Sequence, residues 1–208
     1  MKEKILIHFL FYESMRHFIY FSSSAVTSGG ALSHGDLMKA GRMDIAIHSF
    51  IQGVFLSHDF RKDVKFHFIF YGQPDPPKHI EIQVNDKLEI SKKDIGNLIK
   101  KILYKYKSGE KTEPFPGCFI EKKSFLKIIE ELANNGCEIF ILDEKGEDIR
   151  KAEISDNCVF ILGDHEGLPK KELKRLKQTA TPVSIGTKTY FASQTIAVVN
   201  NELDYRGI

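Results

Sequence analysis

The segment FILGDHEGLPKKE, residues 160–172, passes from an apolar run to a glycine, then to a polar turn and a charged, helix-like stretch. This order is typical of a strand followed by a helix in a parallel sheet. Because Gly163 has no Cβ, a ligand or another backbone segment can approach the strand end closely. Ligands bind at the carboxyl ends of parallel strands. The segment therefore predicts a binding site as well as an α/β fold.

The same alternation extends along the chain and predicts an α/β fold with a largely parallel central sheet. β-branched and aromatic residues mark expected strands at residues 16–22, 65–71, 80–84, 117–120, 138–142, 158–162 and 182–185. Apolar residues at helical spacing mark expected helices at residues 44–57, 93–106, 124–134, 170–178 and 193–202. We expect one domain over residues 15–208.

Composition excludes several classes of protein. The chain has 208 residues, of which 42% are hydrophobic, so it is long and apolar enough for a packed core. Its formal net charge of +2 is too small to indicate nucleic-acid binding by itself. Cys118, Cys137 and Cys158 form neither a disulfide framework nor a CxxC metal motif. These features favour a cytoplasmic protein without a membrane span.

The first twenty-one residues have some features of a signal peptide, since Lys2 and Lys4 precede the apolar run ILIHFLF. That run is short, contains His8 and lacks a following small-residue cleavage site. We therefore expect residues 1–14 to be an N-terminal arm, or an extension ahead of an alternative start at Met15.

The ionisable residues of the opening segment do not have the spacing of a known catalytic motif. Asp164, His165 and Glu166 are consecutive, and consecutive loop residues seldom direct their side chains at one metal ion. His58 is part of an isolated His-Asp pair. The chain contains no GxxxxGK[ST], GxGxxG or GxSxG motif. We expect no metal site.

Two other stretches also end an apolar run in a polar turn. They are EIFILDEKGED, residues 138–148, and TPVSIGTKTYFASQTIAVVNNELD, residues 181–204. Together with residues 160–169, they could form a pocket built largely from backbone N–H and C=O groups. Such a pocket suits an adenine base, whose edge carries both donors and acceptors.

Lysines are concentrated around one expected helix, at positions 92, 93, 100, 101, 105 and 107. A solvated helix face and a surface that contacts RNA phosphates both fit this pattern.

Four segments resemble the TrmY family, the archaeal tRNA pseudouridine N1-methyltransferases of the SPOUT superfamily. They are GRMDIAIHSFIQGVFLSHDFRKDV at 41–64, FYGQPDPP at 70–77, FILGDHEGLP at 160–169, and the C-terminal stretch of residues 183–204. The resemblance covers nearly all of the chain from Met15 onward.

This resemblance implies a SPOUT-type fold with a deep C-terminal trefoil knot within about residues 138–208, and a homodimer. It implies S-adenosylmethionine as cofactor and N1 of pseudouridine in tRNA, at pseudouridine 54 of the T-loop, as the methylated atom. The cofactor-binding residues that it implies are Leu142, Gly163, Ile185, Gly186, Thr187, Lys188, Thr189, Tyr190 and Thr195.

The GRMD block resembles the part of the family that contacts the target nucleoside, with Arg42 and Asp44 as candidate catalytic residues. Asp44 could accept the N1 proton, and Arg42 could stabilise charge on the ring carbonyls or bind a phosphate. Structural roles are the alternatives: Asp44 as a helix N-cap and Arg42 in a surface ion pair.

Three residues depart from the family pattern. His48 stands where the family usually has arginine, and Ser49 and Thr195 stand where it usually has cysteine. Contacts made by the backbone tolerate such changes better than base or phosphate recognition does. Two alternative functions follow: a SPOUT methyltransferase for another RNA such as rRNA, or a non-catalytic RNA-binding dimer.

Overall fold

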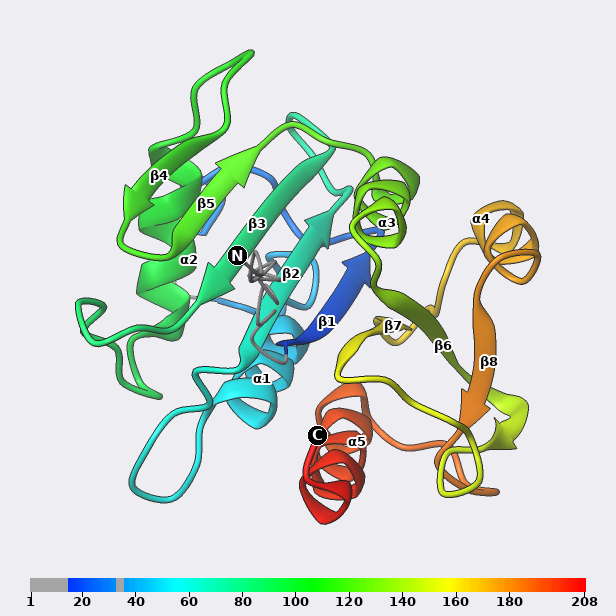
Figure 1. Ribbon diagram of the computed structural model, residues 1–208. Helices are drawn as coiled ribbons and strands as arrows, with labels where there is room; N and C mark the ends of the chain where they lie inside the picture. Colours follow the sequence, from blue (N-terminus) through cyan, green and yellow to red (C-terminus); the bar gives the residue numbers. More distant parts are fainter. Residues whose placement is uncertain (1–14, 33–35) are drawn as a thin grey trace, which may run out of the picture.

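The computed structural model describes residues 15–32 and 36–208. Within these residues the chain forms a single eight-stranded sheet and five helices (Figure 1). The strands are β1 (Met15–Ser22), β2 (Val64–Phe70), β3 (Lys78–Gln83), β4 (Thr112–Phe115), β5 (Cys118–Glu121), β6 (Glu138–Asp148), β7 (Asn157–Gly163) and β8 (Thr181–Ser184). The helices are α1 (Met43–Val54), α2 (Ile95–Tyr104), α3 (Phe125–Asn134), α4 (Lys170–Leu176) and α5 (Ala192–Arg206).

The strand order is β4-β5-β3-β2-β1-β7-β6-β8. The pairs from β2 through β1, β7 and β6 to β8 are all parallel. On the other side of β2, the pairs β2–β3, β3–β5 and β5–β4 are antiparallel. This arrangement confirms the prediction of an α/β fold with a mostly parallel sheet.

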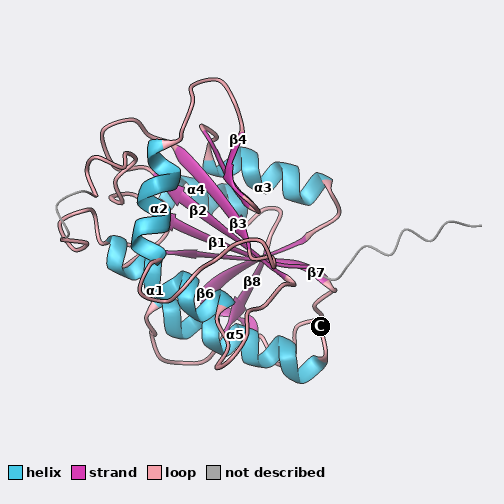
Figure 2. Ribbon diagram, turned by 90° about the vertical axis from the view of Figure 1, so that its left-hand side faces the viewer, coloured by secondary structure: helices cyan, strands magenta, loops and turns pink. Residues whose placement is uncertain are grey.

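Helices lie on both faces of the sheet (Figure 2). One face carries a large core to which α1, α2 and α5 contribute, with Phe50, Ile99 and Ile196 among its fully buried residues. The opposite face carries a smaller core that includes residues of α3 and α4. Burial of these apolar surfaces is the main favourable term in folding.

The expected elements are present, with two differences. β4 is absent from the prediction because it contains Pro114, which lacks a ladder donor; the strand lies at the sheet edge, where such a residue is tolerated. β6 continues to Asp148, well beyond the predicted end at Leu142, and its last residues pair with β8 after a change of register.

The last helix is fastened to the start of β1. The Arg16 guanidinium donates to Asn200 Oδ1 at 3.2 Å and to Asp204 Oδ1 at 2.8 Å. On its other side, α5 packs against α1, where Asn200 Nδ2 donates to the Gly53 carbonyl at 3.1 Å. These contacts hold the C-terminal half of α5 against α1 and the amino end of β1.

None of the helices in the described part of the chain is long and apolar enough to span a membrane. The expected arm of residues 1–14 lies outside the described residues.

Candidate functional site

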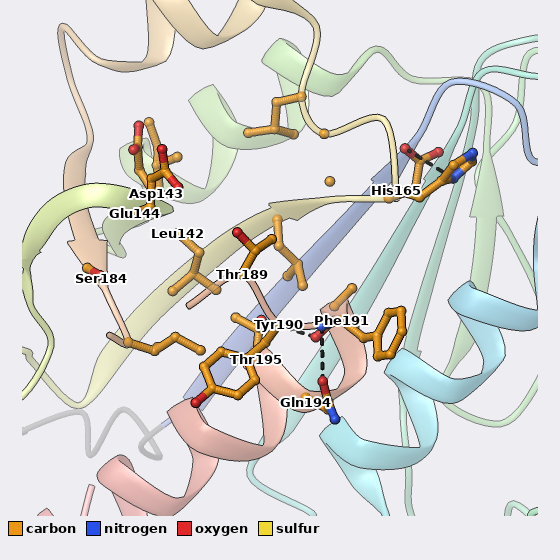
Figure 3. A pocket seen from close by; sticks show the side chains of 18 of the residues that line it. Leu142, Asp143, Glu144, His165, Ser184, Thr189, Tyr190, Phe191, Gln194 and Thr195 are labelled. Carbon is orange, nitrogen blue, oxygen red and sulfur yellow. Dashed lines mark hydrogen bonds and ion pairs between the residues drawn. The ribbon is translucent and has the colours of Figure 1, made fainter. Parts of the chain in front are cut away.

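A cavity of about 630 Å³ opens beside residues 141–144 in the middle of β6, where β7 and β8 end and α5 begins. In Figure 3, Leu142, Thr189, Tyr190 and Thr195 lie close together in this cavity. Eight of the nine predicted cofactor-binding residues line it: Leu142, Gly163, Ile185, Gly186, Lys188, Thr189, Tyr190 and Thr195. Thr187 is not among the lining residues. Three loops distant in sequence thus form one cavity because their strands are neighbours in the sheet.

Gly163 allows another backbone segment to pack against the end of β7. A Cβ at this position would lie 2.3 Å from the Gly167 carbonyl carbon, far inside van der Waals contact. Gly167 itself has φ of +76° and donates its N–H to the Asp164 carbonyl at 3.0 Å. The loop of residues 164–167 therefore folds back on Gly163 in a tight turn.

Asp164 holds this turn in place, since its carboxylate is buried and both of its oxygens accept hydrogen bonds from the protein. Its Oδ1 accepts the Glu166 N–H at 2.9 Å, and its Oδ2 accepts the Ser22 hydroxyl at 2.6 Å. Glu166 in turn accepts the Ser23 hydroxyl at 2.6 Å. The two acids thus attach the turn to the end of β1, which is a structural role.

The loop between β8 and α5 forms the opposite wall of the cavity. Gly186 has φ of +143°, a region that favours glycine, and its N–H donates to Ser184 Oγ at 3.2 Å. At the start of α5, Gln194 Oε1 accepts the Phe191 N–H at 3.1 Å. This side-chain contact satisfies one of the N–H groups that lack a partner at the beginning of a helix.

Several lining residues were not among the predicted ones, notably Asp143, Glu144 and His165. Figure 3 shows Asp143 and Glu144 at one end of the cavity and His165 at the other. Asp143 forms an ion pair with Lys177, and the hydrogen bond from Lys177 lowers the pKa of the Asp143 carboxyl. Each of these residues lies within three positions after a predicted strand end, which is the signal that could have identified them.

Arg42 and Asp44 form a bidentate ion pair at the start of α1. Arg42 Nε donates to Asp44 Oδ1, and an Arg42 terminal nitrogen donates to Asp44 Oδ2, each at 3.0 Å. This hydrogen bonding holds the pKa of the Asp44 carboxyl below its usual value. The helix N-cap position is occupied by Arg42, so the alternative role of Asp44 as N-cap is wrong.

The Arg42 backbone is in the left-handed region, with φ of 58° and ψ of 41°. It is the only non-glycine residue of the described chain with positive φ. Such a conformation costs on the order of 1 kcal/mol and persists where surrounding contacts impose it. The preceding Gly41 is packed so tightly that a Cβ would lie 1.8 Å from the Ser24 carbonyl oxygen.

The ion pair lies beside the cavity, because Ile45, the residue after Asp44, is one of its lining residues. Asp44 also lies near Tyr20, a buried residue of β1. Burial first, and then the Asp164 and Asp44 charges, raise the pKa of the Tyr20 hydroxyl. The two carboxylates are thus grouped around the carboxyl end of β1.

The three departures from the family pattern have different environments. His48 is exposed, Ser49 is fully buried with its Oγ unpaired, and the Thr195 hydroxyl donates to the Phe191 carbonyl at 3.1 Å. Only Thr195 lines the cavity.

Residues 15–208 match the model of a family described as SAM-dependent RNA methyltransferases. The chain belongs to this family. It is 36% identical to the tRNA (pseudouridine(54)-N(1))-methyltransferase of Methanococcoides burtonii, over 91% of this chain and 96% of that one. It is 38% identical to the enzyme of the same name from Methanocella arvoryzae, over 92% of this chain and all of that one.

The fold is similar to that of a solved structure, Archaeoglobus fulgidus Nep1 bound to S-adenosylhomocysteine. The TM-score is 0.59 at 14% sequence identity, over 94% of this chain and all of that chain. These similarities confirm the resemblance on which the sequence-based expectations rest.

Proposed function

We propose that this protein transfers the methyl group of S-adenosylmethionine to N1 of pseudouridine 54 in tRNA. The main support is that relatives named for this reaction align with the chain over more than nine tenths of its length. The cavity at the ends of the parallel strands supports the same reaction, since it provides a site for the cofactor within the matched region.

The cavity fits the proposed cofactor in size and chemistry. Its volume of about 630 Å³ is within the range of small-molecule sites. Its walls combine apolar side chains such as Leu142 and Ile185 with the backbone of two glycine-containing turns. S-adenosylmethionine supplies a methyl group on a positively charged sulfur, which already makes its leaving group a good one. The remaining tasks of the protein are alignment and exclusion of water.

In this proposal Asp44 accepts the proton that N1 of pseudouridine loses as it attacks the methyl group. The bidentate contact with Arg42 orients the Asp44 carboxylate and keeps it ionised. Arg42 therefore acts first as a positioning residue. Its guanidinium has five N–H donors, so those that Asp44 leaves free can contact a ring carbonyl or a phosphate.

The proposal includes the SPOUT trefoil knot, formed within residues 138–208, and a homodimer. The fold likeness to Nep1 supports a SPOUT-type arrangement. Exposed aromatic residues just before α5 and near its last residue, namely Tyr190, Phe191 and Tyr205, favour a protein partner along this helix. A cytoplasmic location is part of the proposal because the substrate is tRNA and the three cysteines are free thiols.

Transfer of labelled methyl to two tRNA transcripts, identical except for uridine or pseudouridine at position 54, tests this function. We expect methylation of the pseudouridine transcript alone, with N1-methylpseudouridine identified by mass spectrometry of the nucleosides. Equal labelling of both transcripts would contradict the proposed target atom.

The same methyl-transfer assay with rRNA added as a third substrate, together with calorimetry, separates the alternative functions. A methyltransferase for another RNA would label rRNA but neither tRNA transcript. A non-catalytic RNA-binding dimer would bind RNA without binding S-adenosylmethionine in calorimetry, and membership in a methyltransferase family argues against it.

A further inference from the structure

A row of buried polar side chains crosses four adjacent strands, away from the cavity. It consists of His17 on β1, His67 on β2, His79 on β3 and Glu121 on β5, all of them buried. Figure 1 shows these four strands side by side. The first three side chains are linked by ring nitrogens: His17 Nδ1 lies 3.0 Å from His67 Nε2, and His67 Nδ1 lies 2.9 Å from His79 Nε2.

Glu121 determines which ring nitrogen of His79 donates a hydrogen bond and which accepts one. Its Oε1 lies 3.1 Å from His79 Nδ1, and Lys123 also pairs with it. Lys123 Nζ lies 2.9 Å from Glu121 Oε2, an ion pair that favours the ionised carboxylate. An ionised carboxylate only accepts hydrogen bonds, so His79 donates through Nδ1 and presents the lone pair of Nε2 to its neighbour.

A second carboxylate lies beside the row at its centre. Glu81 is directly opposite His67 in the β2–β3 register and two residues after His79, so it shares a face of the sheet with both. Glu81 Oε2 lies 3.9 Å from His67 Nδ1. One ligand atom from each of His67, His79 and Glu81 falls within 4.8 Å of the other two.

We propose that His67, His79 and Glu81 bind one divalent transition-metal ion, for which Zn²⁺ is the best fit. Two imidazole nitrogens and one carboxylate oxygen are the ligand types that Zn²⁺ takes, and water completes four-coordination. Spacings of 2.9 and 3.9 Å between donor atoms require only small side-chain movements to surround one ion. Glu81 is part of the β3 strand, so both antiparallel strands contribute ligands.

The surrounding groups would orient the ligands. With the ion on Nε2, His79 keeps its Nδ1–H bond to Glu121, the carboxylate–histidine–metal arrangement common at zinc sites. With the ion on Nδ1, His67 carries its proton on Nε2 and donates it to His17 Nδ1, which then carries its own proton on Nε2. Neither histidine gains or loses a proton overall in this exchange of tautomers.

A metal ion would reach the site from solvent past the side chain of Lys111. Its ammonium lies 3.6 Å from Glu81 Oε2, and its side chain is 42% exposed. A dication arriving at Glu81 would displace the Lys111 ammonium to solvent, which raises the net charge beside Glu81 by one unit. The site shares no residue with the cavity lining, so the ion would have a structural role in joining β2 to β3.

Metal binding by the full chain tests this proposal without reference to methyl transfer. Chain freed of metal is titrated with Zn²⁺ by calorimetry and with Co²⁺ by visible absorption. We expect one ion per chain, with the intense Co²⁺ bands of four-coordinate geometry, and a rise in the melting temperature with Zn²⁺. The variant Glu81→Gln removes one ligand and is expected to weaken binding by more than about tenfold.

Two further variants complete the test. Glu121→Gln, which changes only a partner of a ligand, is expected to weaken binding by roughly 10- to 100-fold. His58→Gln changes an exposed histidine outside the row and is expected to bind like wild type. Circular dichroism establishes that each variant is folded. Equal affinity in Glu81→Gln and wild type, or no binding by wild type, would overturn the proposal.

Discussion

The Arg42–Asp44 ion pair is the residue-scale feature on which the proposed chemistry depends. If Asp44 accepts the N1 proton, Asp44→Asn is expected to lower kcat by roughly 10²- to 10⁴-fold, because an amide cannot accept that proton. Affinity for S-adenosylmethionine should change little, since Asp44 does not line the cavity. Single-turnover methyl transfer and calorimetry measure the two quantities. Asp86→Asn, at an exposed acid paired only with Lys62, is the matched control.

Full activity in Asp44→Asn would exclude the base role and leave the ion pair as a purely structural feature of the turn before α1.

The same pair predicts a pH dependence. The hydrogen bonds from Arg42 hold the pKa of Asp44 below its usual value, so its carboxylate stays ionised at lower pH than that of a free aspartate. Arg42→Met removes the guanidinium and raises this pKa, so the acid limb of the methyl-transfer profile moves to higher pH. Rates measured from pH 4 to 8 test this shift, and superimposable profiles in the two proteins would contradict it.

Gly163 gives a further prediction at this scale. In Gly163→Ala the new methyl group lies 2.3 Å from the Gly167 carbonyl carbon, so the backbone must move. Overpacking of this kind costs about 1–3 kcal/mol, and the displaced turn should also weaken S-adenosylmethionine binding. Gly30→Ala is the control, since its Cβ would lie no closer than 3.8 Å to any described residue other than its two chain neighbours. Urea denaturation and calorimetry of both variants measure these effects; an unchanged affinity in Gly163→Ala would show that the turn does not form the cofactor site.

At the scale of elements, α2 and the residues after it present lysines to solvent. Lys101 and Lys105 are exposed. If they contact tRNA phosphates, Lys101→Gln and Lys105→Gln should each reduce the slope of log affinity against log salt by about one. Lys151→Gln, at an exposed lysine after β6, is the control. An unchanged slope would identify the α2 lysines as a solvated face.

The strands show which elements local sequence patterns predict and which they do not. The runs that end at Leu142, Leu162 and Ile185 were predicted from their β-branched and aromatic residues, and all three residues line the cavity. β4 was missed because Pro114 argues against a strand until its edge position is known. The pairing of His67 with Glu81 was also missed, since it depends on the antiparallel register of β2 and β3.

At the scale of the whole molecule, Arg16 links β1 to the C-terminal helix. Its buried guanidinium donates to Asn200 and Asp204. Arg16→Met removes both hydrogen bonds, while Asp204 keeps its pairing with Arg61, and should cost about 1–3 kcal/mol of unfolding free energy. Arg150→Met, at an exposed arginine paired with Asp148, should cost less than about 1 kcal/mol. Urea denaturation measures the unfolding free energy of both variants. Equal losses of unfolding free energy would show that the contacts of Arg16 with α5 contribute little to stability.

The sequence by itself determined the alternation of strands and helices, the membership of the family and most residues of the proposed cofactor site. These depend on local periodicity and on motifs whose residues are close together in the chain. Only the tertiary structure decided that Arg42 holds the Asp44 carboxylate, that Gly163 packs against Gly167, and that three histidines form one row with Glu121. Those facts depend on turn geometry, sheet order and register, which place side chains from separate segments within hydrogen-bonding distance.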